Sequence, residues 1–241
     1  MAVVSGKGGA GKTSICAAVA VSLAEAGQRV LCIDADVGLR NLDISLGMAQ
    51  EPAIPFTAVM RKEYSLSCAT DHPTLPGLCF LTAPVMETAE ELDASLLGEL
   101  LEEARETFDW CLIDAPAGIG AGFRLAVTHA DQVMIVTSGD PASLRDGART
   151  AQFVEAYSEA AAKIVVNRIR KTFFKRTKST VDDCMDTVGL PLLGIVPEDE
   201  DVPLAAAQGR MPNGKNRRGA REACRHIAAR LMGKKQALMR L

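Results

Sequence analysis

The chain has 241 residues, of which 48% are hydrophobic and 24% charged, with a formal net charge of -3, and one α/β domain can accommodate this size and composition. Aromatic residues make up only 4%, which favours β-branched strands covered by Ala- and Leu-rich helices over a sandwich or barrel. The longest apolar runs, 15–23 and 133–136, are far shorter than the roughly 20 residues that a membrane-spanning helix needs, so we expect no transmembrane segment.

Short β-branched runs alternate with longer segments of helical periodicity along most of the chain. Such alternation predicts right-handed crossovers and a doubly wound, mostly parallel sheet with helices on both faces. We expect one domain over residues 1–233, followed by a short basic tail over 234–241. Residues 48–76 read as loop with short helices, and 208–216 as a turn-rich connection. The predicted strands are 2–4, 29–33, 78–81, 110–113, 132–137, 163–166 and 192–196, and the predicted helices are 13–26, 92–107, 141–157 and 181–188.

A glycine-rich loop lies between the first strand and the first helix. Residues Gly6 to Thr13 satisfy the pattern G-x-x-x-x-G-K-[ST]. In this context, backbone N–H groups and the helix N-terminus converge on phosphate oxygens, and glycines allow the close approach. Lys12 is expected to neutralise β/γ-phosphates, and the Thr13 hydroxyl to ligate Mg²⁺. The predicted phosphate-binding residues are Gly8, Gly9, Ala10, Gly11, Lys12, Thr13 and Ser14.

Carboxylates follow two of the other predicted strands. Asp34 and Asp36 come after strand 29–33, and Asp114 comes after strand 110–113. Beside a phosphate loop, such carboxylates can hold the water ligands of Mg²⁺ and orient an in-line nucleophile. Asp34 or Asp36 could instead cap a turn.

Several motifs resemble one known family of ATPases. The run from Lys7 to Thr13, with its additional lysine, resembles the deviant Walker A loop of the MinD/ParA/NifH ATPases. The runs D-A-D-V-G-L-R-N-L-D from Asp34 and D-A-P-A-G-I-G-A-G-F from Asp114 resemble MinD in particular. Residues 130–146, 165–170 and 193–199 also follow the MinD pattern, so the likeness covers nearly the whole chain.

The resemblance implies roles for the polar residues of the loop and the strand ends. It implies a catalytic set of Lys7, Lys12, Asp34 and Asp36, in which Lys7 reaches the phosphates of the partner across an ATP-sandwiched homodimer and Asp36 positions the attacking water. It also implies that Thr13, Asp34 and Asp114 hold Mg²⁺ directly or through water. Lys7 could alternatively be a solvated loop lysine.

The resemblance further implies a base-binding and a switch segment. Asn167 is expected to hydrogen-bond adenine, since an amide offers both a donor and an acceptor, although Asn at a strand end is also a common turn residue. Arg168 would stack nearby, and the pocket would be closed by Pro197, Glu198 and Asp199. Pro116 and Gly118 would move with the state of the nucleotide.

The chain departs from MinD in one helix. Where MinD proteins usually have two acids that meet MinC and MinE, this chain has Asp146 followed by Gly147 and Ala148. The resemblance implies MinC- or MinE-like regulators, but this departure leaves only Asp146 as a candidate for the surface that they contact.

Basic residues gather toward the end of the chain. Residues 205–241 contain ten Lys or Arg and one acid, Glu222, whereas the remainder has 17 basic and 29 acidic residues. The last eight residues could form a minimal basic anchor for an anionic membrane, presented twice by a dimer, or a frayed extension of the last helix. The predicted membrane contacts are Lys234, Lys235, Leu238, Met239 and Leu241.

Together these features predict a slow, partner-stimulated ATPase that uses ATP and Mg²⁺ and acts as a spatial switch in septum placement, resembling MinD. We expect a cytoplasmic protein that associates peripherally with the inner face of the membrane when ATP is bound. A ParA-like partitioning ATPase that binds nucleic acid and a FlhG-like flagellar placement ATPase are the alternatives. Carriers of the NifH or Mrp type are disfavoured, because no cysteine lies in the Asp114 segment and none of the seven cysteines forms a C-x-x-C pair.

Overall fold

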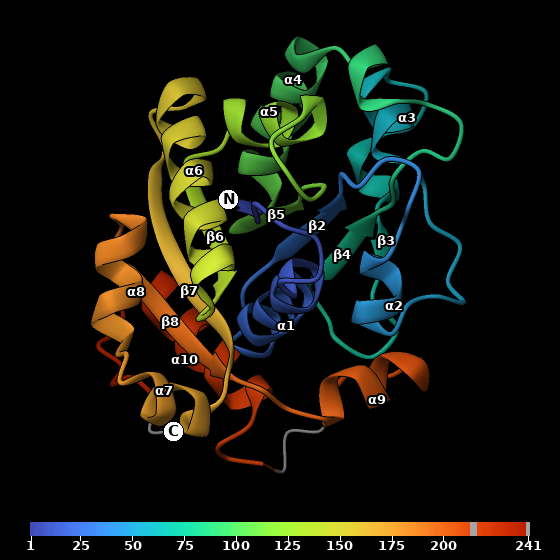
Figure 1. Ribbon diagram of the computed structural model, residues 1–241. Helices are drawn as coiled ribbons and strands as arrows, with labels where there is room; N and C mark the ends of the chain where they lie inside the picture. The colour runs from blue at the N-terminus through green and yellow to red at the C-terminus, as the bar shows by residue number, and fades with distance from the viewer. Residues whose placement is uncertain (213–215, 240–241) are drawn as a thin grey trace.

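An eight-stranded sheet organises the computed structural model, which describes residues 1–212 and 216–239 (Figure 1). Its strand order is β3-β4-β2-β5-β1-β6-β7-β8, and every pair is parallel except β3–β4. The expected doubly wound, mostly parallel sheet is thereby confirmed. The strands are β1 (Ala2–Val4), β2 (Val30–Asp34), β3 (Thr70–Asp71), β4 (Leu78–Leu81), β5 (Trp110–Asp114), β6 (Gln132–Ser138), β7 (Ala161–Ile169) and β8 (Leu192–Pro197).

Helices cover both faces of this sheet. Right-handed crossovers place α1 on one face, where it packs with α10, and place α4, α5, α6 and α8 on the other. The helices are α1 (Lys12–Glu25), α2 (Leu42–Leu46), α3 (Phe56–Met60), α4 (Ala94–Thr107), α5 (Ala121–Thr128), α6 (Pro141–Tyr157), α7 (Lys171–Thr177), α8 (Val181–Val188), α9 (Asp201–Ala207) and α10 (Ala220–Leu231), with 3-10 turns at Leu66–Cys68 and Ala89–Glu91.

Local sequence signals explain the elements whose limits were predicted most closely. The Asp140 side chain accepts a hydrogen bond from Ser143 N at the start of α6, with Pro141 in the first turn. Thr180 and Asp183 form a capping box at the start of α8, and Gly189 ends that helix in the left-handed region. These caps satisfy backbone groups that helix ends leave unpaired.

Other elements carried no such signal. The two-residue strand β3 lies inside the segment expected to be loop, and pairs antiparallel with β4 at the sheet edge. Strand β7 runs over Ala161–Ile169, longer than the predicted 163–166. The short helix α7 follows β7 directly and buries none of its residues. Its sequence therefore has no apolar periodicity from which the helix could be predicted.

The end of the chain folds back onto the body. The Arg230 guanidinium donates hydrogen bonds to the Gln236 carbonyl oxygen, and Met239 is only 8% exposed within the main hydrophobic core. The expectation that Met239 contacts a membrane is therefore wrong for this conformation. Lys234, Lys235 and Leu238 are exposed, and Leu241 lies outside the described residues.

No helix among the described residues is both long enough and apolar enough to cross a bilayer.

The entry into the glycine loop packs tightly against α6, which predicts a difference between two glycines. A Cβ on Gly6 would lie 2.6 Å from both the Asp146 carbonyl oxygen and Thr150 Oγ1, whereas a Cβ on Gly8 would meet nothing within 4 Å. Gly6→Ala should lower the free energy of unfolding by about 1–3 kcal/mol through overpacking, and Gly8→Ala should change it by less than about 0.5 kcal/mol. Denaturant unfolding without nucleotide measures both; equal stabilities would contradict the packing argument.

Candidate nucleotide-binding site

The glycine loop joins the carboxyl end of β1 to the N-terminus of α1. Gly9 and Gly11 have φ values of +81° and +87°, in the left-handed region that favours glycine, and Gly11 is the N-cap of α1. The N-terminal N–H groups of α1 therefore open onto the loop without a side-chain cap. This is the geometry of an anion-binding site at a helix N-terminus.

A buried ion pair lies beneath the loop. Lys12 Nζ is 2.6 Å from Asp114 Oδ1 and 3.3 Å from Thr13 Oγ1, and both charged side chains are almost inaccessible. Burial raises the pKa of Asp114 to about 6, although Lys12 and Thr13 act in the opposite direction. The structure thus brings together three residues that the sequence analysis assigned to the phosphates and Mg²⁺.

Asp34 lies beside Asp114 because β2 and β5 pair in that register. Its carboxylate accepts hydrogen bonds from three backbone N–H groups, those of Asp36 at 3.0 Å and of Asn41 and Leu42 at 3.1 Å each. Burial raises its pKa, while these hydrogen bonds lower it. In this structure Asp34 holds the segment from Asp36 to Leu42, which agrees with the alternative expectation that this residue caps a turn.

Asp36 is placed by that segment at the edge of the site. It is partly exposed, burial raises its pKa, and the positive charge of Lys12 acts in the opposite direction. Within the described residues, no group of three His, Cys, Asp or Glu side chains forms a metal cage. The donor set nevertheless fits Mg²⁺, which commonly binds through one or two protein groups together with substrate phosphates and water.

Lys7 stands apart from these buried groups. Its side chain is exposed at the tip of the loop, whose backbone is held by a hydrogen bond from Ser5 Oγ to the Lys7 carbonyl oxygen. Lys7 and Lys12 therefore occupy opposite environments, although they lie in one short loop.

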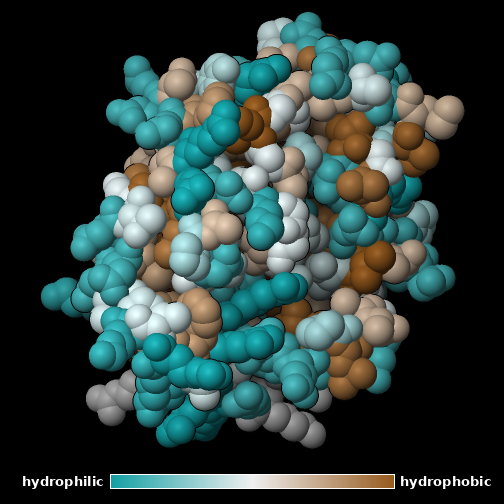
Figure 2. All heavy atoms as spheres, viewed as in Figure 1, coloured by the Kyte–Doolittle hydropathy of each residue, from teal (hydrophilic) through white to brown (hydrophobic). Residues whose placement is uncertain are grey.

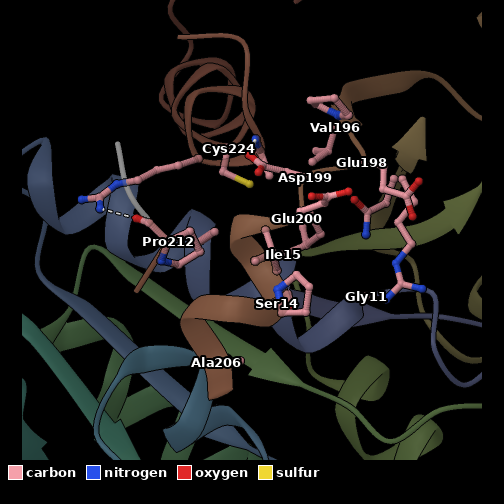
Figure 3. A pocket seen from close by; sticks show the side chains of 18 of the residues that line it. Gly11, Ser14, Ile15, Val196, Glu198, Asp199, Glu200, Ala206, Pro212 and Cys224 are labelled. Atoms are coloured by element: carbon pink, nitrogen blue, oxygen red, sulfur yellow. Dashed lines mark hydrogen bonds between the residues drawn. The ribbon is translucent and has the colours of Figure 1, made fainter. Parts of the chain in front are cut away.

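A cavity of about 610 Å³ continues from the loop along α1. Figure 3 shows Gly11, Ser14 and Ile15 on one side and the β8–α9 connection with Glu198, Asp199 and Glu200 on another. The cavity is lined by the predicted residues Asn167, Arg168, Pro197, Glu198 and Asp199. Its size and its position next to the loop suit a nucleoside.

Asn167 is tied to the glycine loop itself. Its amide nitrogen Nδ2 donates a hydrogen bond of 2.8 Å to the Ala10 carbonyl oxygen, and a Cβ on Gly11 would lie 2.3 Å from the same nitrogen. The side chain is 6% exposed. Asn167 thus fixes the loop against β7.

The other predicted pocket residues also have structural contacts. Asp199 accepts hydrogen bonds from Asp201 N and Ala220 N, which joins the starts of α9 and α10. Glu198 forms an ion pair with Arg170, and this pair lowers the pKa of Glu198. Arg168 is exposed and has a φ of +54°, an uncommon value for a residue other than glycine.

Part of the cavity wall was not predicted. It comes from the start of α7 and from α9 and α10, whose residues share no motif with the loop. Figure 3 shows Ala206 of α9 and Cys224 of α10 at the cavity, with Pro212 accepting a hydrogen bond from Arg221. The packing of α10 against α1 brings the α10 residues to the site, so no local signal could have identified them. The unpredicted lining includes Arg170, Lys171, Thr172, Val202, Pro203, Ala206, Arg221 and Cys224.

The predicted switch segment lies beside the loop. Gly118 has a φ of +91°, and its N–H donates to the Ser5 carbonyl oxygen at 3.0 Å. Pro116 packs on Gly122 near the start of α5, where a Cβ would be 2.4 Å from Pro116 Cγ. Asp146 also adjoins the site, because its backbone carbonyl contacts Gly6 while its side chain is partly exposed.

Comparison with known proteins agrees with this geometry. Residues 1–213 match the CobQ/CobB/MinD/ParA nucleotide binding domain. The chain belongs to this family. The septum site-determining protein MinD of Synechocystis sp. is 36% identical over 86% of this chain and 79% of its own length. MinD of Helicobacter pylori is 36% identical over 86% of this chain and 81% of its own.

Solved structures give the same result. A chain of the MinC:MinD cell division protein complex from Aquifex aeolicus superimposes with a TM-score of 0.90 at 32% identity, covering 99% of this chain and 97% of the other. The chain is thus a MinD-like member of the family, whose fold and ATPase class were correctly predicted from the sequence.

The raised pKa of Asp114 predicts a pH dependence of stability in this MinD-like protein. Since the pKa is about 6 in the fold and 3.8 ordinarily, the folded state binds the proton more tightly between about pH 4 and pH 6. The free energy of unfolding should therefore fall as pH rises through that window. In Asp114→Asn that part of the fall should be absent, whereas the contributions of Asp34 and Asp36 remain. Denaturant unfolding of both proteins at a series of pH values, without nucleotide and with a chelator present, measures this difference. Identical pH slopes of the free energy of unfolding would contradict the assignment of the pH dependence to Asp114.

Proposed function

We propose that this chain hydrolyses ATP as a slow spatial switch in division-site placement, dimeric with ATP and attached to the membrane in that state. The observation that carries the proposal is the contrast between the two lysines of the loop. Lys12 is buried on Asp114, ready to serve the phosphates of its own nucleotide, whereas Lys7 is exposed at the loop tip and free to reach a second molecule.

The site residues fit ATP and Mg²⁺. Lys12 and the N–H groups of residues 8–14 would bind the phosphates, while the Thr13 hydroxyl and, through water, Asp114 and Asp34 would hold the metal ion. Mg²⁺ would neutralise charge that develops on the phosphate oxygens. Asn167 Oδ1 would meet the base within the cavity beyond Gly11.

Hydrolysis requires an ordered water in line with the terminal phosphate. Asp36 is the carboxylate best placed to orient it, because Asp34 is engaged by three backbone N–H groups and Asp114 by Lys12. No dedicated strong base accompanies Asp36, which accounts for slow turnover and leaves room for stimulation by a partner.

The proposed partners would contact the chain around the glycine loop and α6. A second copy would approach over Lys7, Pro116 and Gly118. The MinC:MinD complex of the Aquifex relative supports a MinC-like regulator, which in this proposal would contact α6 near Asp146. MinE-like regulation and cytoplasmic localisation with peripheral membrane attachment belong to the same proposal. The tail supports attachment only in part, because Met239 is buried and Lys234, Lys235 and Leu238 are exposed.

The two lysines give the first test of this proposal. Lys12→Ala should abolish ATP binding, because it removes the buried cation of the loop. Lys7→Ala should keep ATP binding by the monomer but lose ATP-dependent dimerisation and turnover. Calorimetry with a non-hydrolysable ATP analogue measures binding, light scattering measures dimerisation, and phosphate release measures turnover. Full ATP affinity in Lys12→Ala would overturn the assignment of the nucleotide site.

Asp36→Ala gives the second test. Without the carboxylate that orients water, the variant should bind ATP and dimerise but turn over at least about 100-fold more slowly, the lower end of what a positioned acid–base group contributes. Turnover is measured as phosphate release, and dimerisation by light scattering. Loss of nucleotide binding together with hydrolysis would show that Asp36 is a structural residue.

A further inference from the structure

The part of the chain richest in basic residues has some of its charge paired within the fold. Among the ten Lys and Arg of residues 205–241, Arg210 pairs with Asp201, Arg221 with Glu25, and Arg225 with Glu25 and Glu222. Arg230 donates to the carbonyl oxygens of Leu193 and Gln236. Three of the ten cations therefore face carboxylates within the fold, and a fourth is engaged by backbone carbonyl oxygens.

A shorter segment presents its charge outward. Residues 168–178 contain six Lys or Arg and no acid, and all six are exposed. Arg170 pairs with Glu198. In the part of the chain that the structure describes, no carboxylate lies within ion-pair distance of Lys175, Arg176 or Lys178. Because the whole chain has a net charge of -3, this segment is a local basic surface on an acidic protein.

Two adjacent phenylalanines give this surface an apolar component. The Phe174 ring packs on the β6–α6 connection, where a Cβ on Gly139 would lie 2.8 Å from its Cζ. Phe173 meets Phe174 edge to face at 6.0 Å and remains 36% exposed. Phe174 thus holds α7 on the body, and Phe173 lies at the surface among the cations. Figure 2 shows hydrophilic side chains gathered around the place that α7 occupies in Figure 1.

We infer that α7, with Phe173, Lys175, Arg176 and Lys178, is a contact surface for an anionic lipid bilayer; this rests on the membrane attachment proposed above. An aromatic ring among lysines and arginines suits the interface between headgroups and acyl chains. The exposed Phe173 ring can enter the boundary between headgroups and acyl chains, whereas the phosphates of a nucleic-acid duplex would engage only the cations, so a lipid surface uses both components of this segment.

The position of α7 connects this surface to the nucleotide. Arg168, Arg170, Lys171 and Thr172 line the nucleotide cavity, and α7 continues from them without a break. A dimer formed with ATP would present two such surfaces, together with two tails, and so multiply a weak single contact.

Matched charge removals test the inference in the full chain with a non-hydrolysable ATP analogue and Mg²⁺. Each basic contact with an anionic leaflet is worth about fivefold in partitioning. Lys175→Gln with Arg176→Gln should therefore weaken binding to phosphatidylcholine–phosphatidylglycerol vesicles by at least about 25-fold, which is the factor for the two charges of one subunit. The control, Arg217→Gln with Arg218→Gln, removes two exposed charges elsewhere and should change binding less than about twofold. Nucleotide binding in both variants verifies the fold.

A fluorescent reporter tests direct contact. In a Trp110→Phe background, which removes the single tryptophan, Phe173→Trp should shift its emission to shorter wavelength with anionic vesicles and not with phosphatidylcholine alone. No shift, or equal losses in the two charge variants, overturns the inference. Binding to a DNA duplex but not to vesicles assigns the surface to nucleic acid and also overturns it. Failure of the unaltered chain to bind vesicles removes membrane attachment as a whole, whereas undiminished binding by the α7 variant removes only this inference.

Discussion

The buried pair of Lys12 and Asp114 is the interaction on which the site depends. It exists because β5 pairs with both β1 and β2, so that Val3, Asp34 and Asp114 reach the carboxyl edge of the sheet at one level. Burying two charges is costly, and their attraction recovers that cost only when the geometry is good. Without Lys12, Asp114 would be left as an unpaired buried acid. The loop lysine therefore holds the site together before any nucleotide arrives.

At the same edge of the sheet, polar side chains hold backbone segments in place. Asp34 uses its oxygens to hold the segment from Asp36 to Leu42, and Asn167 uses its amide to hold Ala10. These side chains set the shape of loops that short, glycine-rich sequences cannot fix alone. In the proposed function, ligand contacts would fall to loop N–H groups, to Lys12 and Thr13, and to Asp36, which is the least engaged of the three carboxylates. Asp36 thus stands outside the frame that Asp34 and Asn167 hold in place.

The sequence could predict what is encoded locally. Glycines, a lysine and a hydroxyl at fixed spacing after a strand define the loop, and caps define α6 and α8. The contacts that complete the cavity could not be predicted in this way, since Asn167 meets Ala10 across 157 positions and Asp199 meets Ala220 across 21. The resemblance to MinD named Asn167 and Asp199, but it did not indicate that both side chains would be occupied by backbone partners. The wall formed by α10 depends on its packing against α1 and has no motif at all.

The distribution of surface charge is also difficult to predict from the sequence alone. Counting Lys and Arg along the chain points to residues 205–241, but several of those side chains lie opposite carboxylates that are distant in sequence, such as Glu25. Residues 168–178 have fewer charges, yet α7 buries none of its residues and has few acidic neighbours. What an anionic surface meets is the charge left unpaired after folding, held on a rigid support. Because Phe174 packs on the β6–α6 connection and Lys171 and Thr172 line the cavity, this charge is held next to the proposed nucleotide site by the fold itself.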